Sequence, residues 1–93
     1  GGMRRVHVVV TGDVQGVGYR YTMRMIAADA GVSGWARNRH DGSVEAEVEG
    51  TDDRVAEVLA WMAHGPRWAR VRAIQVTEGI PIGGTGFEVR RDG

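Results

Sequence analysis

The sequence predicts an α+β sandwich in which two helices cover one face of an antiparallel sheet. Several short segments alternate apolar and polar residues, as half-buried strands do, and two longer segments repeat apolar residues at helical spacing. A length of 93 residues allows a single domain with one modest core. Gly1 and Gly2 precede Met3 and are interpreted as the remnant of an expression tag, so residues 3–93 are expected to form that domain.

The first half of the chain predicts a strand, a helix and a β-hairpin. Valines that alternate with more polar residues predict a strand over residues 6–11. Apolar residues at helical spacing predict a helix over residues 21–30, with Gly31 in the left-handed conformation that often ends helices. Two alternating segments, residues 33–39 and 43–50, flank an Asp-Gly turn and predict the hairpin.

The second half predicts a helix, a strand, a glycine-rich loop and a short last strand. The helix is expected to follow Thr51, a capping residue, and to end at a Gly-Pro pair. Residues 71–78 predict the next strand, residues 79–86 the loop, and residues 87–90 the last strand. The order β-α-β-β-α-β, followed by a short strand, is the ferredoxin-like split βαβ pattern.

The composition excludes several classes of function. The chain has no cysteine, which excludes disulfides, thiolate catalysis and cysteine metal sites. All 12 basic residues are arginines, so a lysine Schiff base is excluded as well. The formal net charge is +0, whereas a nucleic-acid-binding protein usually has a basic excess. No segment is long and apolar enough to span a membrane, no signal peptide is visible, and we expect a cytoplasmic protein.

Three glutamates alternate with apolar residues in the second strand of the hairpin: Glu45, Glu47 and Glu49. They could form a cation site, but we prefer ion pairs with arginines of neighbouring strands, such as Arg37 and Arg39. This strand would then have one solvated face. We expect neither a metal nor a cofactor.

Residues 12–20, which read Gly-Asp-Val-Gln-Gly-Val-Gly-Tyr-Arg, connect the first strand to the first helix. The three glycines allow a tight turn and a close approach of backbone N–H groups to a ligand. A loop that leads into a helix N-terminus also presents the positive end of the helix dipole, so it can bind an anion. Arg20 lies at this end, where the dipole disfavours a cation, and its presence indicates a negative group nearby.

Asn38 is expected near the same place. The first two strands are joined through a helix and should run in the same direction, so their C-terminal ends meet at one rim of the sheet. The glycine-rich loop follows the first strand, and Asn38 lies near the end of the second. An amide side chain is uncommon inside a strand, which by itself is weak evidence for a function.

Two segments of the chain match known signatures and make it resemble the acylphosphatase family. Residues 12–20 match the pattern G-x-V-Q-G-V-x-[FY]-R, and residues 34–50 match G-[FYW]-x-x-N-x-x-x-G-x-V-x(5)-G. Both matches are complete and in the right order, and the resemblance covers the chain from Met3 onward.

The resemblance implies the fold predicted above and the hydrolysis of acyl phosphates to a carboxylate and inorganic phosphate. It implies that Arg20 binds the phosphate and that Asn38 positions the attacking water. The backbone of five residues would form a phosphate cradle: Gln15, Gly16, Val17, Gly18 and Tyr19. We expect a monomer that acts on a small-molecule acyl phosphate and binds phosphate or sulfate as a product-like ligand, without nucleic acid or membrane.

The chemistry needs few protein groups. The leaving carboxylate belongs to an acid with a pKa of roughly 4 and departs without a proton, so no general acid is required. Arginine and loop N–H groups can stabilise the phosphoryl transition state by position and charge. Two other interpretations are a non-catalytic ferredoxin-like module, for example one that binds RNA, and a fragment of a larger maturation enzyme that uses carbamoyl phosphate.

Overall fold

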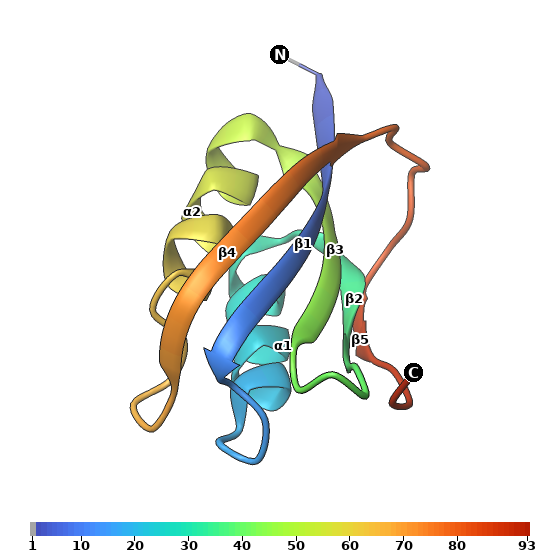
Figure 1. Ribbon diagram of the computed structural model, residues 1–93. Helices are drawn as coiled ribbons and strands as arrows, with labels where there is room; N and C mark the ends of the chain where they lie inside the picture. Colours follow the sequence, from blue (N-terminus) through green and yellow to red (C-terminus); the bar gives the residue numbers. More distant parts are fainter. Residues whose placement is uncertain (1) are drawn as a thin grey trace.

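The computed structural model describes residues 2–93, in which two helices lie on one face of a five-stranded sheet (Figure 1). The elements follow one another in the predicted order. They are β1 (Met3–Asp13), α1 (Tyr19–Ala30), β2 (Ser33–Asn38), β3 (Val44–Thr51), α2 (Asp52–Met62), β4 (Arg70–Gly79) and β5 (Phe87–Val89). Neither helix of this part of the chain is long and apolar enough to cross a membrane.

The strands are arranged in the order β4-β1-β3-β2-β5. β1 and β2 both pair antiparallel with β3, so they run in the same direction and end at the same rim, as predicted. The four long strands form the expected antiparallel sheet, whereas the short β5 pairs parallel with β2 and makes the sheet mixed. This happens because the chain crosses from β4 at one edge to β2 at the other before it forms β5 (Figure 1).

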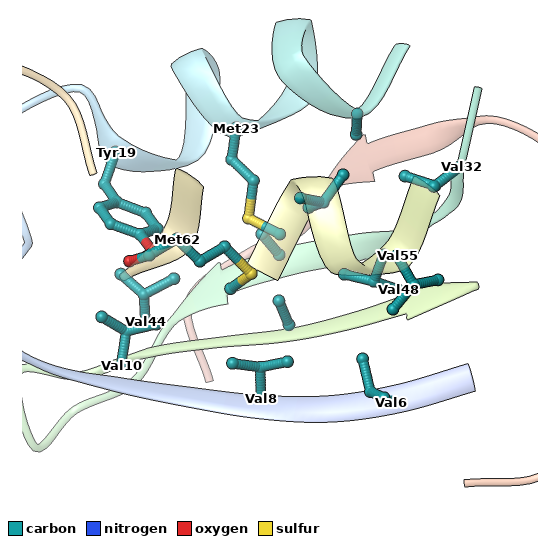
Figure 2. Close-up of a cluster of buried hydrophobic side chains, with 14 of the residues drawn as sticks. Val6, Val8, Val10, Tyr19, Met23, Val32, Val44, Val48, Val55 and Met62 are labelled. Carbon is teal, nitrogen blue, oxygen red and sulfur yellow. The ribbon is translucent and has the colours of Figure 1, made fainter. Parts of the chain in front are cut away.

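The core lies between the sheet and the helices (Figure 2). Val6, Val8 and Val10 of β1 are fully buried, as their alternation predicts. Each helix contributes one stripe of buried residues: Tyr19, Met23 and Ala27 from α1, and Val55, Val58 and Met62 from α2. Each fully buried valine or methionine side chain stabilises the fold by about 1.5–3 kcal/mol.

The glutamates of β3 form ion pairs, as predicted, but not with all the expected partners. Glu45 accepts a hydrogen bond from Arg37 Nε at 2.6 Å and lies 2.7 Å from His7 Nε2. Arg39 was predicted to pair with these glutamates, and this is wrong. Because β2 ends one residue earlier, Arg39 belongs to the turn, where its Nη2 lies 4.0 Å from Asp41.

The predicted solvated face of β3 is also wrong at Glu49, which is only 1% exposed. Residues 80–86, which we call the strap, pass over this end of the sheet (Figure 1). The Glu49 carboxylate accepts hydrogen bonds from the backbone N–H groups of Ile82 and Gly83, at 2.8 and 2.9 Å, and from Arg5 Nη1 at 3.2 Å. These bonds, that of Ile82 most of all, lower the pKa of Glu49 despite its burial.

Candidate active site

The loop between β1 and α1 takes its shape from two glycines. Gly16 and Gly18 have φ angles of 74° and 78°, in the left-handed region that favours glycine. A Cβ at Gly16 would meet nothing within 4 Å, so the backbone angle alone requires glycine there. Gly18 is the N-cap of α1, and the helix therefore begins at Tyr19, two residues earlier than predicted.

The N-terminus of α1 is left open. Its N-cap makes no side-chain hydrogen bond to the helix, and its first turn has no acidic residue. The first turn of α2, by contrast, contains Asp52 and Asp53, although the predicted cap Thr51 donates to Asp53 Oδ1 at 2.7 Å instead of capping the backbone. The free N–H groups and the dipole of α1 can therefore accept an external anion.

Tyr19 fixes this open end of α1 to the rest of the fold. Its hydroxyl donates a hydrogen bond to the carbonyl of Met62, at 2.7 Å, and its ring packs against Trp61 with centroids 5.2 Å apart. Burial raises the pKa of the Tyr19 hydroxyl far above its usual value, so the group remains a donor. The first helical residue is thus held rigidly, which gives the adjacent loop a defined end.

Arg20 follows immediately and is held only loosely. Its Nη1 lies 3.4 Å from Asp92 Oδ1, and the two side chains are 22% and 59% exposed. Exposed ion pairs of this kind contribute about 0–1 kcal/mol. The guanidinium also lies over the ring of Tyr21, 5.6 Å from its centroid. A phosphate group can therefore replace the Asp92 carboxylate at little cost.

Asn38 is the last residue of β2, and it is 8% exposed. It pairs with Val44, which pairs with Val10, so all three lie on the face of the sheet that the helices cover. Figure 2 shows Tyr19 of α1 close to Val10 and Val44, which places the start of α1 over this row. Among residues 2–93, Asn38 Oδ1 has no hydrogen-bond partner. A buried amide oxygen without a partner costs about 1–3 kcal/mol, so this atom is available to a water or ligand.

The C-terminal segment connects Arg20 with Asn38. Gly93 N–H donates to the Asn38 carbonyl at 3.0 Å, while the preceding residue, Asp92, contacts Arg20. The structure therefore brings both predicted catalytic residues to the rim where β1 and β2 end. Asp92 was not predicted as a neighbour of Arg20, because its place depends on how the chain continues past β5.

The five predicted cradle residues, Gln15, Gly16, Val17, Gly18 and Tyr19, span the end of this loop and the first residue of α1. None of them lines the cavity of about 320 Å³ at the other end of the sheet, which lies between β2, β5 and the strap. The candidate site therefore lies on the rim, and the groups it offers there are backbone N–H groups, the Arg20 guanidinium and the Asn38 amide oxygen.

The chain is similar to known proteins over almost its whole length. The family model for acylphosphatase matches residues 6–89. The acylphosphatase of Thiobacillus denitrificans is 48% identical over 97% of this chain and 100% of its own length. That of Trichormus variabilis is 49% identical over 94% of this chain and 86% of its own length.

Solved structures show the same fold. The acylphosphatase from Bacillus subtilis superposes with a TM-score of 0.89 at 33% identity, over 94% of this chain and 98% of that one. A full-length HypF, in its phosphate- and nucleotide-bound form, has a TM-score of 0.89 at 23% identity, and the match covers 98% of this chain but 12% of HypF. The second likeness shows the fold alone. From the matched family model and these relatives, the chain belongs to the acylphosphatase family.

Proposed function

We propose that this protein hydrolyses acyl phosphates to a carboxylate and inorganic phosphate at the rim formed by the loop, Arg20 and Asn38. One observation carries this assignment of the site: an open helix N-terminus lies at the same rim as a buried amide oxygen that has no hydrogen-bond partner in the described part of the chain. The first suits an anion and the second suits a water, the two reactants that the hydrolysis must bring together.

In the proposed complex, the N–H groups of residues 15–19 and the guanidinium of Arg20 hold the phosphoryl oxygens. The donors point toward the charge that spreads over these oxygens in the transition state. Binding displaces the Asp92 carboxylate from Arg20, because both anions compete for the same guanidinium. A phosphate or sulfate ion should occupy this site as a product-like ligand.

Asn38 Oδ1 accepts a hydrogen bond from the attacking water, which leaves a lone pair of the water oxygen free to approach phosphorus. The new P–O bond forms as the bond from phosphorus to the acyl oxygen breaks, and its electron pair leaves with the carboxylate. The water proton passes to a phosphate oxygen. Since the leaving group is a weak base, the reaction needs no protonated side chain beside it.

Acetyl phosphate and benzoyl phosphate hydrolysis by the wild type, Arg20→Ala and Asn38→Ala tests this proposal. We expect a clear wild-type activity that either substitution abolishes or reduces strongly. A wild type without activity would contradict the proposed reaction. A robust activity that survives both substitutions would contradict the proposed site.

We further propose a cytoplasmic monomer that acts on a small molecule. A second candidate function, which the sequence left open, is that of a domain within a larger maturation enzyme that uses carbamoyl phosphate; the fold does recur as 12% of a larger protein, HypF. Hydrolysis of carbamoyl phosphate in preference to benzoyl phosphate would favour this candidate. An RNA-binding module is disfavoured by the net charge of +0, and a salt-sensitive affinity in the submicromolar range would be needed to support it.

A further inference from the structure

The side chain of Gln15 forms contacts that a backbone cradle does not require. Its Nε2 donates one hydrogen bond to the carbonyl of Arg39, at 2.7 Å, and another to the carbonyl of Ser43, at 2.9 Å. These two carbonyls stand at the neck of the β2–β3 turn, where Arg39 N–H also donates to the Ser43 carbonyl at 2.9 Å. Both hydrogens of the amide nitrogen are therefore used to join the loop to this turn.

The position of this turn matters because Arg39 directly follows Asn38 in the chain. The loop itself contains Gly16 and Gly18, and it is held at one end by β1 and at the other by Tyr19. Gln15 supplies a further attachment between these ends, and it runs to the backbone next to Asn38. The side chain of Gln15 therefore links the loop directly to the backbone beside Asn38.

We propose that Gln15 is a positioning residue, whose side-chain amide holds the phosphate cradle at the correct distance from the water bound by Asn38. This inference rests on the proposed function. The backbone N–H of Gln15 belongs to the cradle, whereas its side chain acts through the turn. A displacement of about 1 Å between reacting groups can cost on the order of 10²-fold in rate, so a small relaxation of the loop would be visible in kcat.

The requirement is for a donor of glutamine length. A glutamate would place carboxylate oxygens against two carbonyl oxygens, which repel them, and it would push the loop away from the turn. A methionine has a similar length and no donor, so it removes both hydrogen bonds without adding a charge. Comparing the two variants thus separates the effect of losing the two hydrogen bonds from the effect of repulsion between the new carboxylate and the carbonyl oxygens.

The experiment compares Gln15→Met and Gln15→Glu with Gln75→Glu, which changes the only other glutamine of the chain at an exposed position of β4. The kcat and KM for benzoyl phosphate and the dissociation constant of inorganic phosphate are measured, together with urea unfolding to correct for the folded fraction. We expect Gln15→Met to lower kcat by roughly 10–100-fold and Gln15→Glu to lower it further, while Gln75→Glu leaves it unchanged.

A double substitution separates positioning from a purely structural role. If Gln15 acts through Asn38, then Gln15→Met combined with Asn38→Ala should lose little more than Asn38→Ala alone. Fully additive losses would overturn the proposal, and so would a Gln15→Met variant with the kcat of Gln75→Glu. A wild type that hydrolyses no acyl phosphate would instead refute the proposed function on which this inference rests.

Discussion

Arg5 and Arg20 carry the same charge at opposite ends of the sheet, and the fold treats them in opposite ways. Arg5 is 7% exposed and donates to Glu47 at 2.6 Å and to Glu49 at 3.2 Å. Arg20 has one ionic partner among residues 2–93, the exposed Asp92, at 3.4 Å. Beneath the strap, Arg5 is paired with Glu47 and Glu49 of β3. At the loop, by contrast, a weakly paired cation, a helix N-terminus and an amide oxygen remain available to a ligand.

The difference distinguishes a structural ion cluster from a binding site. A buried charge with several good partners is costly to break and has little left to offer a ligand. A loosely paired guanidinium beside an open helix end can exchange its partner for a phosphate group. Substitutions in the ion cluster beneath the strap, such as those of Arg5, should therefore change stability. Substitutions at the loop or at Arg20 should change activity.

The largest effect is expected from Arg20→Ala. Removing the guanidinium should lower kcat/KM by at least about 10³-fold, because it stabilises charge that develops on the phosphoryl oxygens. The free energy of unfolding should change by less than about 0.5 kcal/mol, because the ion pair is exposed. Arg24→Ala, an exposed arginine of the same helix, is the matched control for steady-state kinetics and should behave as the wild type.

Arg5→Met should show the opposite result. Glu49 would remain buried without its cationic partner, and the free energy of unfolding should fall by about 3–5 kcal/mol. Urea unfolding measures this loss, and the kcat of the folded fraction should stay at the wild-type value. Arg4→Met is the control, because Arg4 forms an exposed pair with Glu78, and solvent-exposed pairs add little to stability. Equal losses for Arg4 and Arg5 would contradict the difference in burial.

Asn38→Ala should lower kcat by about 10²-fold, because the water loses its orientation. Phosphate affinity should change little, since Arg20 and the loop remain. Unlike Arg5→Met, this substitution removes a buried acceptor that none of residues 2–93 satisfies, so urea unfolding should show no loss of stability. A loss of phosphate binding equal to the loss of kcat would place Asn38 in the cradle instead.

The order of elements and the placement of Arg20 and Asn38 at one rim could be predicted from the sequence, because they depend on local patterns and on the connection between strands. Alternation gave the strands, helical spacing gave the stripes of α1 and α2, and the connection through α1 placed Arg20 and Asn38 at one rim. The signature specifies glutamine at position 15, although a cradle made only of backbone N–H groups would accept other residues there. The sequence thus contained an indication that the side chain of Gln15 makes contacts of its own.

The remaining features depend on contacts between distant segments. Glu49 continues the alternation of β3 and was predicted on a solvated face, but the strap, some thirty residues later in the chain, covers it and supplies two N–H donors. The contact of Asp92 with Arg20 likewise arises only after β5 has paired with β2. Local periodicity carries no information on such pairings.

A smaller effect concerns acid stability. The strap lowers the pKa of Glu49 below 4.5, its ordinary value, chiefly through the Ile82 N–H group. Its contribution is therefore present above pH 4.5 and is lost as the pH falls through the lower value of the folded state. Urea unfolding at several pH values should show that Glu49→Gln loses less stability than the wild type in this window. Arg20→Ala should keep the wild-type dependence in this window, because Arg20 lies at the opposite end of the sheet from Glu49.

The smallest effect is expected from Asp92→Asn. This substitution removes the anion that competes with phosphate for Arg20, and phosphate should bind about 2–5-fold more tightly, in line with a weak exposed ion pair. Calorimetric titration with inorganic phosphate at low salt measures the change, and Asp29→Asn in the exposed part of α1 is the control. A weaker affinity would mean that Asp92 orients Arg20 for the ligand.

The distinction between the two arginines is tested most directly by a phosphate titration followed by NMR of backbone amides and arginine Nε–H groups. In the wild type, saturable shifts are predicted for the amides of residues 15–19 and for Arg20 Nε. In Arg20→Ala, the loop amides should no longer shift. The amides of Ile82 and Gly83 and the Nε of Arg5 should not move. Shifts confined to the strap, or loop shifts that persist in Arg20→Ala, would contradict the account.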